Sequence, residues 1–228
     1  MDLQNQKDAL SRITHDRHRT NFFKKHEQDL LAFLVQRVPA WITSDMLTAT
    51  GLAGSIVTAT GFVLANYFGC LFLLLSILGF LINWLGDSLD GRLAYFRNKP
   101  RKWYGFTLDL TVDWLTNILI GVGFIVYVFG IWEIFGFFFV VLYGWAIMIA
   151  LLRYQITGIY SIDSGLLGPT EVRIIISLLL ILEIIFPGSI IYSCVLSCVI
   201  LLIINVKDFL YLLKAADKKD KDEHAAKQ

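Results

Sequence analysis

Charged side chains are absent from long parts of this 228-residue chain. None occurs in residues 46–86, 114–132, 134–152 or 184–206. A helix needs about 20 mostly apolar residues to cross the hydrocarbon core of a bilayer. With a hydrophobic fraction of 56% and a mean hydropathy of +0.63, the chain is also far more apolar than a soluble domain of its size. The sequence therefore predicts an all-α, polytopic membrane protein embedded in a lipid bilayer.

Cysteine is scarce as well. Cys70, Cys194 and Cys198 lie in apolar stretches, and the last two are four residues apart on one expected helix. A disulfide along one helix is disfavoured by its geometry, and no His or acid lies nearby to complete a metal site, so we interpret all three as packing residues. The chain has no basic stripe with interleaved aromatics, and we expect no nucleic-acid partner. Residues 1–30 are polar and charged, which argues against a cleavable signal peptide.

The order of polar and apolar stretches divides the chain into three regions. Residues 1–45 are expected to form a cytoplasmic arm that ends in an amphipathic interfacial helix over 27–38, where apolar residues recur at helical spacing before Pro39. Residues 46–213 form the membrane domain, and residues 214–228 form a charged cytoplasmic tail whose Lys and Asp content favours disorder. Breaks in hydropathy predict six transmembrane helices, at about 46–66, 70–95, 105–129, 132–154, 171–186 and 189–213.

Positive charge is confined to every second connection between these helices. Lys and Arg occur in the N-terminal arm, the 96–102 loop, the 153–173 connection and the tail, whereas the connections near residues 67, 130 and 188 contain none. The positive-inside rule then places both termini in the cytoplasm, and we expect a multi-pass protein of the bacterial inner membrane. Glu133 and Glu183 lie towards the opposite interface, where we expect solvated helix ends.

Four aspartates stand out at the cytoplasmic ends of the second and third expected helices. Asp87 and Asp90 are three residues apart, and Asp109 and Asp113 are four apart, so each pair shares one helix face. The short loop between the helices should bring both acidic faces to the same depth. Acidic side chains in a membrane are costly and imply a function, and their oxygens suit Mg²⁺ or Mn²⁺. The alternative is a set of salt bridges to two nearby arginines, Arg92 and Arg97.

This part of the sequence resembles the signature of the CDP-alcohol phosphotransferase family, D-x2-D-G-x2-A-R-x8-G-x3-D-x3-D. The matching residues are Asp87, Asp90, Gly91, Ala94, Gly105, Asp109 and Asp113. Two departures stand out, because Tyr95 replaces the family arginine and nine residues rather than eight separate it from the second glycine. The segment from Ser44 to Gly51 is similar to the family's P-N-x-L-T-x-x-G segment, with Ser44 in the proline position.

The resemblance implies a six-helix membrane enzyme that transfers a phosphate-bearing group from a CDP-linked donor to an alcohol and releases CMP. It assigns two divalent cations, Mg²⁺ or Mn²⁺, to the four acids, and it makes Asp113, the last of them, the general base for the acceptor hydroxyl. The cytidine pocket is implied at Gly91, Ala94 and Gly105, with Thr48 as a further candidate. Homodimers are common among proteins that resemble this one, and we expect a homodimer here.

Three arginines are candidates for binding the acceptor. Arg153 ends the fourth expected helix and Arg173 begins the fifth. Arg97 is a candidate to replace the family arginine, with Arg92 as the alternative. Guanidinium groups bind phosphate bidentately, so these residues favour a phosphorylated alcohol such as inositol phosphate or glycerol phosphate. The alternative is that Arg153 and Arg173 reach towards lipid headgroups, with Glu171 as a surface partner of Arg173.

The function expected from these features is phospholipid synthesis, in which a phosphatidyl group passes from CDP-diacylglycerol to a polar alcohol. One alternative is a transferase of the CDP-choline or CDP-ethanolamine type that acts on a lipid alcohol. Another is a cation transporter that uses the acids as its ion path. Against the transporter, the acids cluster at one membrane face, and the outward halves of the second and third helices are expected to offer no polar relay.

Overall fold

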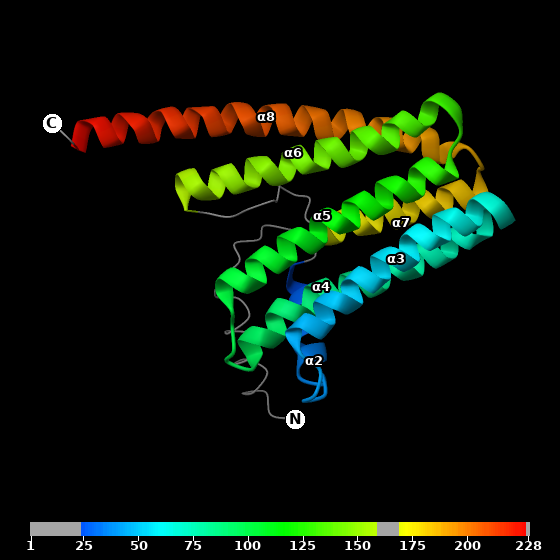
Figure 1. Cartoon of the computed structure of the whole chain (residues 1–228), viewed down its shortest axis with the longest axis horizontal. Helices are drawn as coiled ribbons and strands as arrows, with labels where there is room; N and C mark the ends of the chain where they lie inside the picture. The colour runs from blue at the N-terminus through cyan, green and yellow to red at the C-terminus, as the bar shows by residue number, and fades with distance from the viewer. Residues whose placement is uncertain (1–23, 159–168, 227–228) are drawn as a thin grey trace.

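The computed structural model describes residues 24–158 and 169–226, which form a bundle of α-helices with no strand in these ranges (Figure 1). The helices are α2 (Lys24–Val35), α3 (Ser44–Phe68), α4 (Leu73–Phe96), α5 (Lys102–Tyr127), α6 (Glu133–Thr157), α7 (Pro169–Ile185) and α8 (Ser189–Ala226). Short 3-10 helices, η1 (Cys70–Phe72) and η2 (Gly130–Trp132), lead into α4 and α6. The expected arm up to residue 23, and residues 159–168 of the 153–173 connection, lie outside the described residues.

Five of these helices are long and apolar enough to cross a membrane, namely α3, α4, α5, α6 and α8. They start within three residues of the starts predicted for the first four spans and the sixth. The prediction of an all-α, multi-pass membrane protein is supported at this level. The fifth predicted span coincides with α7, which has only 17 residues, fewer than the roughly 20 that a span needs.

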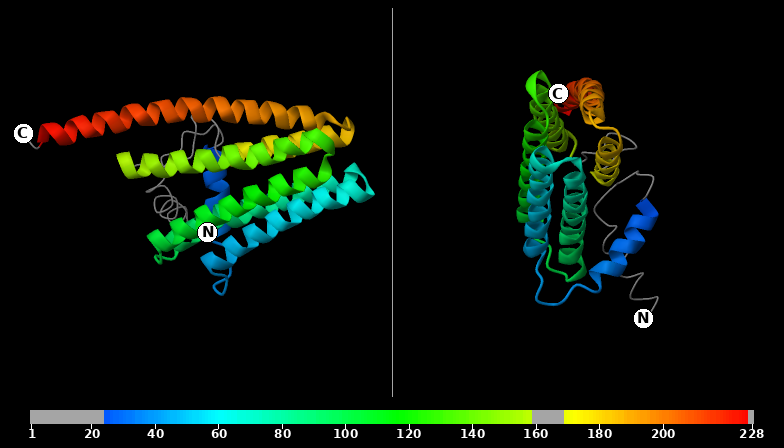
Figure 2. Two further views of the ribbon diagram at one scale, coloured as in Figure 1. Left: turned by 45° about the horizontal axis from the view of Figure 1, so that its top comes forward. Right: turned by 90° about the vertical axis from the view of Figure 1, so that its right-hand side faces the viewer.

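From α3 onwards, consecutive helices run in alternating directions, so the bundle has two ends (Figure 1). At one end, which we call the site end, α3, α5 and α7 begin. At the other, the turn end, the chain reverses near Gly69, Gly130 and Gly188, all of which have positive φ. α3 packs against both α4 and α5, α8 lies along α6, and α7 contacts α4 and α8 (Figure 2).

The most extensive contact in the bundle brings the backbones of α3 and α4 together. A Cβ atom on Gly54 would lie 2.5 Å from the Asn83 backbone nitrogen and 2.7 Å from the Gly79 carbonyl oxygen, closer than packed atoms approach. Nearer the turn end, Ser76 Oγ donates to the Thr58 carbonyl oxygen over 2.9 Å, and Thr58 Oγ1 donates to the Ser76 carbonyl oxygen over 3.3 Å. Small residues permit this close packing of apolar helices, and they fix α4 against α3.

The N-terminal helix α2 differs in part from the amphipathic helix expected over 27–38. It ends at Val35, and both Leu31 and Val35 are fully buried in a cluster with side chains of α4. Leu30 and Phe33 remain 47% and 41% exposed. The apolar residues of α2 are therefore divided between a contact with α4 and the surroundings of the bundle.

The prediction of a disordered tail over residues 214–228 is wrong for its described residues, 214–226, because α8 continues as a helix to Ala226. At 1.5 Å per residue its 38 residues span about 57 Å, and its C-terminal part extends beyond the end of α6 (Figure 1). Lys221 Nζ lies 2.6 Å from Asp217 Oδ2, an ion pair between successive turns that stabilises a helix. The Lys and Ala residues of this segment have high helix propensity, which composition alone does not distinguish from disorder.

The prediction that Glu183 is a solvated helix end is also wrong. Its side chain is only 2% exposed and bridges the turn between α7 and α8. The carboxylate accepts hydrogen bonds from the backbone nitrogens of Gly188 and Ile190, over 2.9 and 2.8 Å, and from the Tyr127 hydroxyl over 2.9 Å. It also accepts one from Ser189 Oγ over 3.2 Å. Glu183 thus provides acceptors for backbone N–H groups that a helix start leaves without intrahelical partners.

We expect Glu183→Ala to lower the free energy of unfolding by about 2–3 kcal/mol, because the substitution leaves several buried donors without an acceptor. The measurement is thermal stability of the purified protein in detergent. Glu133→Ala is the matched control, since Glu133 is exposed and accepts a single backbone bond, from Gly130 over 3.0 Å. Equal losses of stability in the two variants would contradict this account of Glu183.

Candidate metal and nucleotide site

Three of the four aspartates singled out in the sequence meet at the site end, between α4 and α5. One carboxylate oxygen from each of Asp87, Asp109 and Asp113 lies within 4.8 Å of the other two, and all three side chains are half-buried. α3 packs against both helices and holds them at this separation. The two acidic helix faces therefore come together for these three residues.

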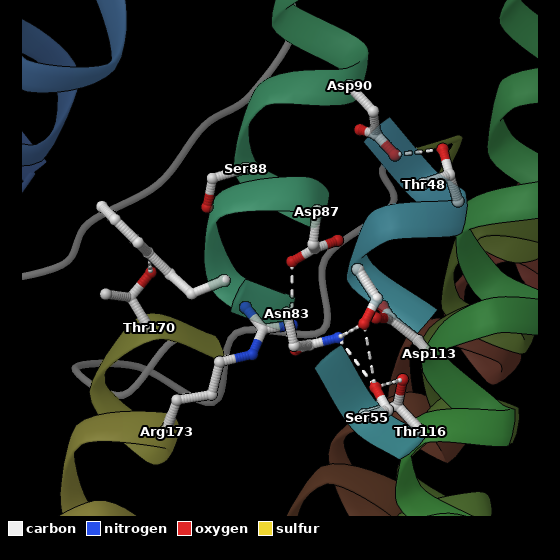
Figure 3. Close-up of polar contacts among 12 residues, drawn as sticks. Thr48, Ser55, Asn83, Asp87, Ser88, Asp90, Asp113, Thr116, Thr170 and Arg173 are labelled. Carbon is white, nitrogen blue, oxygen red and sulfur yellow. Dashed lines mark hydrogen bonds and ion pairs between the residues drawn. The ribbon is translucent and has the colours of Figure 1, made fainter. Parts of the chain in front are cut away.

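The fourth aspartate, Asp90, lies about one turn further along α4 and is bound by α3 (Figure 3). Thr48 Oγ1 donates to Asp90 Oδ2 over 2.6 Å, and Ser44 Oγ donates to the Asp90 carbonyl oxygen over 2.8 Å. Asp90 and Thr48 are only 7% and 6% exposed. Asp90 is thus outside the group of three acids, and Thr48, a candidate for the nucleotide pocket, contacts an acid.

Of the three candidate arginines, Arg173 is the one that the structure brings to the acids (Figure 3). Its Nη2 atom lies 2.8 Å from Asp87 Oδ2, and the side chains are 13% and 25% exposed. α7 therefore contributes to the site although it lies far from α4 and α5 in the sequence. Tyr143 of α6 also lies close to Asp113 and Arg173, and it was not predicted because it occurs in an aromatic-rich apolar stretch.

A chain of hydrogen bonds fixes the start of α7 beside α4. Trp84 Nε1 donates to Thr170 Oγ1 over 3.3 Å, and Thr170 Oγ1 donates to Glu27 Oε1 of α2 over 3.1 Å. Thr170 lies one turn before Arg173, so this chain sets the position from which the arginine extends. The sequence offered no indication of it, because its three members are far apart along the chain.

The other arginines considered in the sequence have different partners. Arg153 Nη2 lies 3.3 Å from Asp208 Oδ2 of α8. Arg97 donates to carbonyl oxygens of the connection between α2 and α3, those of Val38, Pro39, Ala40 and Ile42. Arg92 donates to the Ser88 carbonyl oxygen in its own helix. Arg97 therefore ties the loop after α4 to the segment before α3.

A layer of polar side chains lies next to the acids on the side of the turn end (Figure 3). Asn83 Nδ2 donates to Ser55 Oγ and to the Gly51 carbonyl oxygen, each over 3.0 Å, and Ser55 Oγ lies 2.8 Å from Thr116 Oγ1. Asn83 Oδ1 has no hydrogen-bond partner among the described residues. Asn83 could have been found from the sequence by its helical spacing, because it precedes Asp87 by one turn of the same helix.

The two glycines of the matched motif face open space. Apart from the adjacent residues and the backbone of the same helix, no described atom lies within 4 Å of a Cβ atom built on Gly91 or Gly105. Gly91 follows Asp87 by one turn of α4, and Gly105 precedes Asp109 by one turn of α5, so each glycine shares a face with an acid. Ala94 is half-buried in the last turn of α4. Glycine costs about 1 kcal/mol relative to alanine inside a helix, and packing gives no reason for it here.

The three acids suit a divalent cation. Oxygen atoms bound to one Mg²⁺ ion at about 2.1 Å lie up to roughly 4.2 Å apart, so the observed separation closes with small side-chain rotations. The carboxylates also lie beside uncrowded backbone at Gly91 and Gly105. This arrangement places cation ligands next to space for a flat, anionic ligand.

Comparisons with known proteins leave the family unassigned. No family model matches this chain, and no curated protein matches it. The likeness to the CDP-alcohol phosphotransferases stays a prediction from the motif residues.

Proposed function

We propose that this protein is a CDP-alcohol phosphotransferase that moves a phosphatidyl group from CDP-diacylglycerol to a polar alcohol and releases CMP. The observation that carries the proposal is the meeting of Asp87, Asp109 and Asp113 at one end of an apolar bundle, with Gly91 and Gly105 uncrowded one turn away. Acids in such a setting are costly, and glycines without a packing role leave room for a ligand. Together they support a metal-assisted site for a nucleotide diphosphate.

The proposal includes the placement in the membrane. The site end faces the cytoplasm of a bacterium, α7 is the fifth of six spans, and α2 lies at the membrane surface beside α4. Lys99 and Arg101, in the loop between α4 and α5, support this orientation, because cytoplasmic loops are rich in Lys and Arg. A lipid donor then reaches the acids sideways between helices, while CMP and a polar acceptor exchange with the cytosol. We also propose a homodimer.

The carboxylates of Asp87, Asp109 and Asp113 are the proposed cation ligands, and the resemblance adds Asp90. Bound Mg²⁺ or Mn²⁺ would neutralise the negative charge of the diphosphate. Asp113 takes the proton from the acceptor hydroxyl. Asn117, one turn later, donates from Nδ2 to the Asp113 main-chain carbonyl oxygen over 2.7 Å.

The nucleotide and the acceptor take different sides of this group in the proposal. Cytidine lies over Gly91, Gly105 and Ala94. Thr48 orients Asp90 through its hydrogen bond to that carboxylate. Arg173 binds a phosphate of the acceptor, which favours a phosphorylated alcohol such as inositol phosphate or glycerol phosphate. The bonds of Arg153 and Arg97 to other partners give those two candidates less support than Arg173.

A cation transporter is the alternative from another class, and one observation bears on it. Polar side chains do continue from the acids towards the turn end, first as Ser55, Asn83 and Thr116 and then as Thr58 and Ser76. These residues are at most 6% exposed and most of their bonds join packed helices. Such a layer leaves little room for a hydrated ion, so the enzyme is the better-supported proposal.

The test is release of CMP by the purified protein with Mg²⁺ or Mn²⁺, CDP-diacylglycerol and a panel of acceptors. The expected result is CMP formation that depends on the acceptor and that EDTA abolishes. CDP-choline and CDP-ethanolamine with a lipid alcohol test the related transferase in parallel. Absence of CMP with every donor would overturn both enzyme proposals, and cation uptake into liposomes would then support the transporter.

A further inference from the structure

An arginine forms an ion pair with one of the carboxylates that the proposed function assigns to a metal ion. Arg173 Nη2 lies 2.8 Å from Asp87 Oδ2 (Figure 3), and the two side chains are 13% and 25% exposed. Arg173 also lies within electrostatic range of Asp113. The guanidinium therefore supplies positive charge where a divalent cation would supply it.

The Arg173 guanidinium and a divalent cation compete for the same carboxylate oxygens. Three carboxylates within 4.8 Å repel one another, and Arg173 offsets part of that repulsion. A divalent ion on the same oxygens would offset more of it and would repel the guanidinium. Tight metal binding and an intact contact between Arg173 and Asp87 are thus unfavourable together.

We propose that Arg173 is an exchangeable counter-ion of the acidic group. It binds Asp87 while the group lacks a metal ion, and it turns to an anionic phosphate when a divalent cation binds. The inference rests on the proposed function for the metal ion at these carboxylates and for the identity of that phosphate, which would belong to the acceptor. Metal and phosphate then strengthen each other's binding, and linkage requires that each raises the affinity of the other by the same factor.

The start of α7 is fixed beside α4, so the exchange is confined to the side chain of Arg173. Thr170, one turn earlier, is tied to Trp84 of α4 and to Glu27 of α2. The base of the arginine is therefore fixed, while its long side chain has several rotatable bonds. The exchange requires only that the guanidinium swings away from Asp87.

A permanent salt bridge would have the opposite consequence. If Arg173 only held Asp87 in place, its removal would loosen a metal ligand and weaken metal binding. If Arg173 competes with the metal, its removal makes metal binding tighter. The sign of the change in metal affinity therefore separates the two roles.

The experiment measures binding of Mn²⁺ to the purified full-length protein by electron paramagnetic resonance, with and without inorganic phosphate. In the unsubstituted protein, phosphate should raise Mn²⁺ affinity by about fivefold or more, as expected for coupled sites. Arg173→Gln should raise Mn²⁺ affinity about tenfold in phosphate-free buffer, because a nearby unit charge is removed. In this variant the effect of phosphate should disappear. Protein-free samples correct for direct binding of Mn²⁺ by phosphate.

Arg101→Gln is the matched control. Arg101 also forms an ion pair, with Asp45, but both side chains are largely exposed and neither belongs to the acidic group. Its substitution should leave Mn²⁺ affinity and the phosphate effect unchanged. Arg173→Lys retains the charge and should bind Mn²⁺ like the unsubstituted protein.

Either of two results overturns the exchange. One is an Arg173→Gln variant that binds Mn²⁺ no more tightly than the unsubstituted protein. The other is Mn²⁺ affinity in the unsubstituted protein that phosphate does not raise, a result that requires no variant to fold. Failure of the proposed function would look different, because coupling of Mn²⁺ and phosphate would persist while no CDP-linked donor released CMP.

Discussion

Asp113→Asn should lower kcat for CMP release by about a thousandfold, because it removes the carboxylate that accepts the proton of the acceptor hydroxyl. The amide has nearly the same shape as the carboxylate but is not a base. Its hydrogen bond from Asn117 goes to the main-chain carbonyl oxygen and is retained. Binding of the donor nucleotide should change much less than turnover. The measurement is steady-state CMP release at saturating donor, with nucleotide binding measured separately.

Asp29→Asn is the control for this substitution. Asp29 lies on an exposed part of α2, so the same chemical change there should leave kcat close to that of the unsubstituted protein. Turnover that persists in Asp113→Asn would contradict the assignment of the general base. Equal losses of turnover and of nucleotide binding would instead assign Asp113 to the binding of the donor.

Gly91→Leu should raise the KM for the CDP-linked donor by about tenfold or more while the protein stays folded, as expected when binding rather than chemistry is lost. Gly91 has open space where a side chain would be. A larger side chain can therefore be accommodated by the helices, and helix propensity even favours it by up to about 1 kcal/mol. The same side chain fills the space proposed for cytidine. Donor KM and thermal stability, measured on the same preparation, separate the two effects.

Gly54→Leu is the contrasting variant. A side chain at Gly54 meets the backbone of α4 at Asn83 and Gly79, so this substitution should destabilise the fold by about 3 kcal/mol or more. A Gly91→Leu protein with unchanged donor KM would contradict the placement of the nucleotide. A Gly91→Leu protein as unstable as Gly54→Leu would assign the glycine to packing.

The sequence predicted well the structural features that follow from periodic patterns of residues. Apolar stretches without charge mark the helices, and the spacing of Asp87, Asp109 and Asp113 correctly indicated that acids from two helices meet. The prediction failed where the composition of a segment suits both a helix and a disordered chain. The tail from residue 214 has a composition that suits both disorder and a helix, and the helix forms as a continuation of α8.

Contacts between distant segments were the part that the sequence could not supply. Arg173 and Arg153 looked equivalent as helix-end arginines, but α7 packs against α4 and carries Arg173 to Asp87, whereas Arg153 lies against Asp208 of α8. Which partner each arginine finds depends on how the helices pack. No periodic pattern in the sequence indicates which helices pack together.

Glu183 shows a second limit of sequence-based prediction. A lone glutamate near a Pro-Gly turn is usually solvated, and only the folded turn directs its oxygens at the start of α8. Asp90 is similar, because Thr48 precedes it by more than forty residues and still supplies its hydrogen bond. Both carboxylates acquire their partners through tertiary packing.

The central claim is that Asp87, Asp109 and Asp113 form a metal centre, and anomalous diffraction from crystals grown with Mn²⁺ and CDP tests it most directly. The account predicts a manganese peak among these three carboxylates, with the nucleotide over Gly91 and Gly105. Arg173 should then be turned away from Asp87. A map with ordered carboxylates, saturating Mn²⁺ and no peak between α4 and α5 would contradict the account.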